Sequence, residues 1–120
     1  MSRRITTTHN VKAATISTAA TVLSFYGPRG MTGALRGIGA VVTTGVTDAA
    51  CGLKLGNAAD DDKFGTLSVP VGAAATGTNA ATINAVDSNL IAANEQVILK
   101  TDGACTAGAA DIAVVIDWFK

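Results

Sequence analysis

The final residues of the chain, Asp111–Phe119, show the most regular pattern in the sequence. Every second side chain is large and apolar, in the order Ile112, Val114, Ile116 and Trp118. A period of two places these side chains on one face of a β-strand. The opposite face mixes two aspartates with apolar residues, so both faces are partly covered. The pattern therefore predicts a strand in the centre of a sheet or at an interface.

Shorter apolar runs separated by glycine precede this strand. The turn sequence Gly27-Pro28-Arg29-Gly30 ends one of them, and Pro70 marks another as an edge strand or a bulge. The predicted strands are Val22–Tyr26, Ala34–Thr44, Cys51–Leu55, Phe64–Val71, Ala81–Val86 and Glu95–Lys100. Helix signals at Val11–Leu23 and Ser88–Ala93 are weak, because the first is rich in Thr and the second is very short.

Seven or eight short strands at regular spacing favour an all-β sandwich or barrel. We expect a jelly-roll-like antiparallel β-sandwich with an extended N-terminal arm. A β-solenoid is the alternative, but the sequence has no fixed repeat period.

The composition leaves little material for a core. Roughly half of the 120 residues are Ala, Gly, Thr or Ser, and the aromatic residues are three Phe, one Tyr and one Trp. Aromatic side chains usually supply much of the buried area. We therefore expect one domain, stabilised further by burial against other copies or a larger partner.

The N-terminal segment differs from the rest of the chain. Residues 1–20 are polar, rich in Thr and only weakly periodic. We assign them to an N-terminal arm that lies on a neighbouring subunit, and residues 21–120 to the β-sandwich domain.

Charge and hydropathy argue against two classes of partner. Nine basic and nine acidic residues give a net charge of zero, with no basic excess for a nucleic-acid backbone. The longest uncharged stretch, Phe64–Val86, contains Pro70 and several polar residues, so we expect no membrane span. Arg3-Arg4 is followed by polar residues in place of the apolar segment of an export signal. We expect an unprocessed chain made in a cytoplasm.

Two cysteines, Cys51 and Cys105, are compatible with a disulfide but do not require one. In a reducing compartment the default is two thiols that behave as small apolar groups. Free thiols are therefore the expectation, with a disulfide as the alternative.

Residues for catalysis are sparse. His9 is the single histidine and has no neighbouring nucleophile motif. Asp60-Asp61-Asp62 could hold Ca²⁺ but lacks the EF-hand spacing, so a solvated turn is favoured. Gly37-Ile38-Gly39 lacks the remaining features of a dinucleotide fingerprint. We expect no enzyme activity, no cofactor and no metal.

Interaction with other proteins is the remaining role for exposed polar and aromatic groups. Four arginines could bind an acidic surface or form subunit salt bridges. The candidate interaction residues are Arg3, Arg4, His9, Arg29, Arg36 and Trp118.

The second half of the chain carries a family resemblance. A strand at Asn94–Lys100, a loop of Gly, Thr and Ala at Thr101–Ala109, and a last strand of alternating Val and Ile at Ile112–Phe119 follow one another. The order Leu35–Thr44, a sparse loop and Cys51–Leu55 also fits. These segments resemble the small capsid decoration, or cement, proteins of tailed phages, over about Leu23 to Lys120.

The resemblance implies a jelly-roll protein that binds the major capsid protein at capsomer junctions and stabilises the head. Such a protein resides on the outer surface of the virion after synthesis in the host cytoplasm. A homotrimer is favoured over a dimer, because of the symmetry of the capsid junctions. The alternative is a small lectin-like or other surface-binding sandwich, for which Trp118 and Tyr26 are the candidate aromatic platforms.

Overall fold

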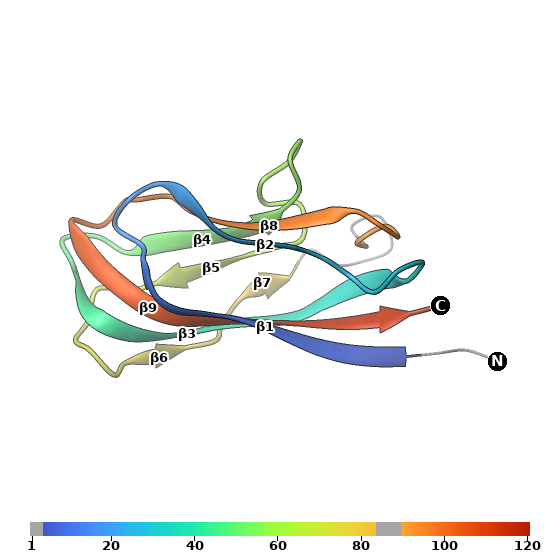
Figure 1. The fold of residues 1–120 in the computed structure, drawn as a ribbon. Helices are drawn as coiled ribbons and strands as arrows, with labels where there is room; N and C mark the ends of the chain where they lie inside the picture. The colour runs from blue at the N-terminus through green and yellow to red at the C-terminus, as the bar shows by residue number, and fades with distance from the viewer. Residues whose placement is uncertain (1–3, 84–89) are drawn as a thin grey trace.

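The computed structural model of the protein describes residues 4–83 and 90–120, and its regular structure there consists of β-strands. Two antiparallel sheets lie one above the other and form a sandwich (Figure 1). The predicted all-β fold is confirmed.

The first layer, sheet A, has the strand order β1-β9-β3-β6, and the second layer, sheet B, has the order β2-β8-β4-β5-β7. The strands of sheet A are β1 (Arg4–Thr15), β9 (Ala107–Phe119), β3 (Thr32–Thr47) and β6 (Gly77–Thr78). The strands of sheet B are β2 (Ala20–Tyr26), β8 (Gln96–Thr101), β4 (Cys51–Gly56), β5 (Gly65–Val69) and β7 (Thr82–Ile83).

The pairing of the strands is that of a jelly roll. Strands β4 and β5 form the innermost pair, β3 and β6 the next, β2 and β8 the third, and β1 and β9 the outermost. One long hairpin folded over on itself gives this nested order. The short strand β7 adds to the edge of β5.

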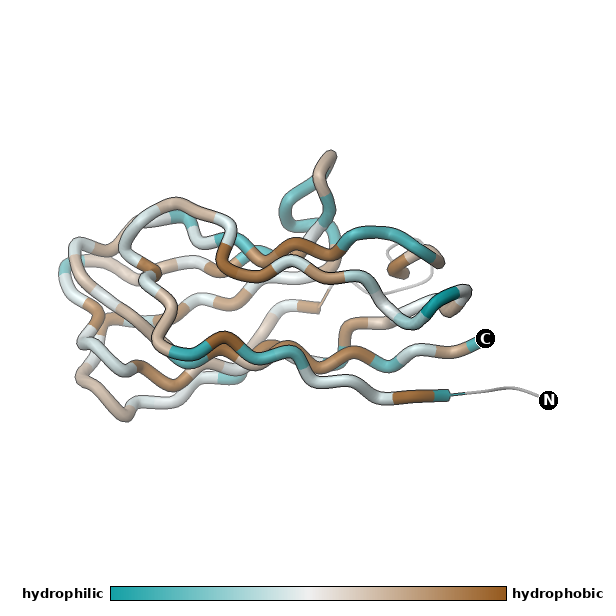
Figure 2. The backbone as a smooth tube through the Cα atoms, in the orientation of Figure 1, coloured by the Kyte–Doolittle hydropathy of each residue, from teal (hydrophilic) through white to brown (hydrophobic). Residues whose placement is uncertain are grey.

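The hydrophobic core lies between the two sheets. In β9 the predicted apolar face points inward, and Ile112, Val114, Ile116 and Trp118 are each at most 2% exposed. In β4, which belongs to sheet B, the alternating side chains of Cys51, Leu53 and Leu55 also point inward and are buried. Figure 2 shows the hydrophobic residues gathered along the strands, whereas the loop after β4 is largely hydrophilic.

The predicted N-terminal arm is wrong. Residues Arg4–Thr15 form β1, which pairs with β9 of the same chain and is an edge strand of sheet A. Ala14 and Ile16 belong to the core, and Ile5 and Val11 pack against it. The alternation of apolar side chains in β1 is masked by Thr and His, which is why the segment looked like a loose arm.

Other boundaries also differ from the predictions. The segment with a weak helix signal, Val11–Leu23, contributes to β1 and β2. Strand β5 ends at Val69, directly before Pro70, which cannot donate a ladder hydrogen bond. Parts of the predictions at Ala81–Val86 and Ser88–Ala93 fall on residues 84–89, outside the described residues. The described chain includes no helix of the length and hydropathy needed to cross a bilayer.

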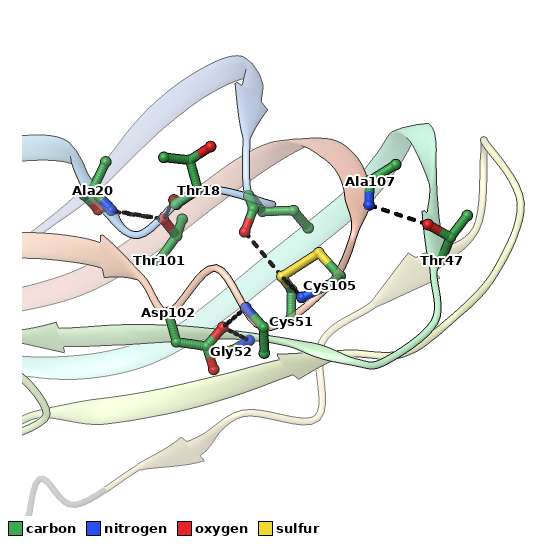
Figure 3. Close-up of a disulfide and its surroundings, with 11 residues drawn as sticks. Thr18, Ala20, Thr47, Cys51, Gly52, Thr101, Asp102, Cys105 and Ala107 are labelled. Atoms are coloured by element: carbon green, nitrogen blue, oxygen red, sulfur yellow. Dashed lines mark hydrogen bonds between the residues drawn. A yellow bond between two sulfur atoms is a disulfide. The ribbon is translucent and has the colours of Figure 1, made fainter.

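A disulfide joins Cys51 at the start of β4 to Cys105 in the loop before β9, which corrects the expectation of free thiols (Figure 3). The two Cα atoms are 5.2 Å apart, within the usual range for a disulfide. Both side chains are buried, and the Cys105 amide donates a hydrogen bond to Sγ of Cys51 at 3.1 Å. The fold brings together two positions that are separated by 54 residues in the sequence.

Polar contacts hold the same end of the sandwich. Asp102 accepts hydrogen bonds from the amides of Gly52 and Ala104, each at 2.9 Å, and so ties the loop after β8 to β4. Thr101 donates its hydroxyl proton to the carbonyl of Thr18 in the β1–β2 connection (Figure 3). The disulfide therefore lies in a region where three segments are already joined.

Candidate functional site

The outer face of sheet A is lined by small side chains. In the register of β1, β9 and β3, Thr8 lies beside Val115, which lies beside Gly37. One step along the strands, the next row contains Asn10, Ala113 and Gly39. Because β3 contributes a glycine to both rows, no side chain rises from the sheet at these two positions.

A shallow groove of about 520 Å³ lies on this face, and we call it the outer groove. Gly39 and Ala113 form part of its floor, Val41 and Asn79 lie on the β6 side, and Lys12 lies on the β1 side. The complete lining consists of Asn10, Val11, Lys12, Gly39, Ala40, Val41, Gly77, Thr78, Asn79, Asp111, Ile112 and Ala113. The groove combines an apolar floor with the basic side chain of Lys12 and the acidic side chain of Asp111, whose Oδ1 accepts a hydrogen bond from the Ala13 amide at 2.7 Å.

Three of the predicted arginines lie in the described residues, and they do not form one cluster. Arg4 begins β1, whereas Arg36 occupies a bulge in β3, where it forms a salt bridge of 3.3 Å with Asp117. Arg29 lies in the exposed turn between β2 and β3, and Arg3 falls outside the described residues. An interaction role for these side chains stays a prediction.

His9 is partly buried, at the edge of the space between the two sheets. Its ring stacks on Phe25 of β2, with ring centroids 3.7 Å apart and planes 10° apart. The indole Nε1–H of Trp118 donates to Oγ1 of Thr7 at 2.7 Å, and this oxygen lies 3.0 Å from Nε2 of His9. Because the Thr7 oxygen accepts the indole proton, the Thr7 hydroxyl can donate its own proton to Nε2 of His9. Nε2 can accept this proton only when the imidazole is neutral.

This arrangement predicts a stability that depends on pH. Burial lowers the pKa of His9 below its ordinary value of 6.5. The unfolded chain therefore binds a proton more readily than the folded chain. The contribution of neutral His9 is complete above pH 6.5 and is lost as the pH falls towards the lowered pKa. In urea titrations between pH 7.5 and 5, we expect wild type to lose more unfolding free energy than His9→Phe, which keeps a stacked ring. A difference between the two proteins that stays constant with pH would contradict the prediction.

Trp118 is not available to a surface partner, which corrects its place among the candidate interaction residues. Its side chain is 1% exposed and lies against the backbone of Gly27 and Gly33. An aromatic platform for a sugar must present a ring face to solvent, so Trp118 does not provide one. Tyr26, the second candidate, is 62% exposed at the end of β2.

The acidic cluster Asp60-Asp61-Asp62 lies in the exposed loop after β4. The side chain of Asn57 accepts hydrogen bonds from the amides of Ala59 and Asp60 and so shapes the turn. A hydrogen bond with Asp60 and its negative charge raise the pKa of Asp62. Asp61 lies 3.8 Å from Nζ of Lys54. These contacts are those of a self-supported polar turn.

A second surface escaped the sequence predictions. Strands β1 and β2 are edge strands of the two sheets, on the same side of the sandwich (Figure 1). Partly buried apolar side chains line the gap between them, and we call this surface the open side. These residues are Ile5, Val11, Val22, Leu23 and Phe25. The available signal was the alternation of Ile5, Thr7, His9 and Val11, which is weak because two of the four are polar.

Comparisons with known proteins give a structural similarity and no match by sequence. The chain matches no protein-family model, and no curated protein matches it. Among solved structures, a chain of the "Cyanophage Pam1 capsid asymmetric unit" is similar with a TM-score of 0.47 and 14% sequence identity. The similarity covers 98% of this chain and 84% of that chain.

Proposed function

We propose that this protein is a non-enzymatic structural protein of a phage head, a decoration protein that binds the major capsid protein. In this role it is made in the host cytoplasm and stabilises the outer capsid surface at capsomer junctions. A homotrimer is favoured over a dimer because a threefold assembly matches the symmetry of such junctions.

The observation that carries the proposal is the outer groove on sheet A. Its floor is low because Gly39 and Ala113 occupy neighbouring strands, and Val41 on its rim is 48% exposed. A backbone lying along this floor meets few bulky side chains, while Lys12 and Asp111 offer polar contacts at the rim. We assign the groove to an extended segment of the capsid protein.

The jelly roll supports this role by making the groove rigid. Strand β9 lies between β1 and β3 over most of its length, and the inner face beneath the groove is core. A surface on paired central strands changes little on binding, so little conformational entropy is lost.

The test is binding of the purified protein to expanded, undecorated phage capsids, measured by co-sedimentation and by the melting temperature of the shell. We expect saturable binding and a higher melting temperature. Val41→Glu should weaken binding about tenfold or more, because a carboxylate at the contact must leave water. A protein that leaves the shell's melting temperature unchanged at saturating concentration would refute the proposed function.

Val71→Glu is the matched control. Val71 is 56% exposed and does not line the outer groove, so the same charge change is made on another surface. We expect this variant to bind like wild type. Equal weakening by both variants would show that the outer groove is not the contact.

A further inference from the structure

The open side differs from the opposite side of the sandwich in the length of its edges. Its edges are β1 and β2, of 12 and 7 residues, whereas the opposite edges are β6 and β7, of 2 residues each. A long edge strand presents a row of unpaired backbone donors and acceptors, which is a template for another strand. In β1 the bulge after Val11 interrupts this edge, so its regular part is Arg4–Val11.

Apolar groups accompany the free backbone edges. Phe25 and Leu23 on β2, and Ile5 and Val11 on β1, are only partly buried although they pack against the core. The stacked rings of His9 and Phe25 bridge the two layers at this side. A partner that pairs with the strands would also complete the burial of these side chains.

The spacing of the two edges identifies the partner. One edge belongs to each layer, so a partner that pairs with both must present two edges at the spacing of this sandwich. A second copy of the chain meets this requirement because it has the same two edges at the same spacing. Strand β1 leads through a short connection into β2, which returns in the opposite direction in the other layer (Figure 1).

The charges of the two strands select between the two ways of joining copies. Strand β1 carries Arg4 and Lys12, and neither of them forms a salt bridge within residues 4–83 and 90–120. Strand β2, with the sequence ATVLSFY, has no charged residue. Pairing β1 with β1 would bring two basic strands together, whereas pairing β1 with β2 avoids like charges.

We propose that copies of this chain associate through their open sides, with β1 of one copy antiparallel to β2 of the next. The rotation axis that relates the copies lies parallel to the strands, so rotation about it leaves the direction of each strand unchanged. Because β1 and β2 run in opposite directions within one copy, β1 of one copy meets an antiparallel β2 of the next. In a ring of two copies both edges pair with the same partner, and in a ring of three copies β1 and β2 pair with two different partners. The proposal rests on the self-association included in the proposed function and names its surface.

The test compares Ser24→Lys with Ser24→Glu in the full chain. Ser24 is exposed on β2, and its hydroxyl accepts a hydrogen bond from the Gln96 side chain at 2.8 Å. Both variants replace this hydroxyl, but only lysine adds a positive charge beside the regular part of β1 in the next copy, which carries Arg4. By native mass spectrometry and light scattering, we expect Ser24→Lys to weaken association roughly tenfold and Ser24→Glu to leave it unchanged or stronger.

Two further measurements locate the contact. Thr82→Lys adds the same charge on β7, at the opposite edge, and should associate like wild type. Hydrogen exchange at low and high protein concentration should protect β1 and β2 selectively. Thermal unfolding of each variant at low concentration verifies that the subunit is folded.

Three results would overturn the proposed contact: a wild-type protein that stays monomeric at every concentration, equal effects of the lysine and glutamate variants, or protection confined to other strands. The capsid role is tested separately. A monomer that binds shells would refute this contact and leave the capsid role standing. An oligomer joined through β1 and β2 that ignores shells would do the reverse.

Discussion

Removal of the Cys51–Cys105 disulfide is expected to lower the free energy of unfolding by about 4 kcal/mol. The bond closes a loop with a sequence separation of 54 residues, and the chain-entropy model gives this value for a loop of that length. This is a large share of the 5–15 kcal/mol typical of a domain. Urea unfolding of oxidised and reduced wild type measures the difference.

The double variant Cys51→Ala/Cys105→Ala is the control for packing. Both positions are buried, so alanine removes sulfur contacts in addition to the covalent bond. The reduced wild type keeps the sulfur atoms and therefore isolates the effect of the bond. A loss below about 1 kcal/mol on reduction would mean that the polar contacts of Asp102 and Thr101 already restrain this end.

Substitution of Gly33 is the second large expected effect. Gly33 lies on β3 directly opposite Trp118 of β9, and a Cβ atom there would be 2.6 Å from Cζ3 of the indole. The backbone has little freedom to move, because Gly33 and Ile91 exchange two hydrogen bonds of 2.8 Å. We expect Gly33→Ala to destabilise the protein by about 2–3 kcal/mol through overpacking, measured by chemical unfolding with circular dichroism.

The matched control lies on the same strand. A Cβ at Gly37 would have no atom within 4 Å, so Gly37→Ala should be neutral or stabilising by up to about 1 kcal/mol. A second check is the double variant Gly33→Ala/Trp118→Leu, whose smaller side chain makes room for the new methyl. Its loss should be smaller than the sum of the two single losses, and strict additivity would show that the contact with Trp118 is not the cause.

The strands with large apolar side chains were predictable from the sequence because their alternation is local. The inward face of β9 and the face of Cys51, Leu53 and Leu55 followed from a period of two alone. Strand β1 was not predictable in the same way. Its inward positions include Thr7 and His9, which become suitable for the interior only through Trp118 and Phe25, residues distant in the sequence.

The candidate surfaces show the same division. Local sequence identified exposed polar residues such as Arg4 and Arg36, but a groove requires knowing that Gly39 lies beside Ala113 on another strand. The open side likewise exists because the jelly roll places β1 and β2 at the same side of two layers.

The amino-acid sequence alone therefore determined the class of fold and the direction in which the best strands face. Tertiary structure decided the strand status of the N-terminal segment, the burial of Trp118 and the pairing of Cys51 with Cys105. Each of these depends on partners distant in the sequence, such as the cysteines, 54 residues apart, and Thr7 and Trp118, 111 residues apart. Side-chain periodicity has no information over that range.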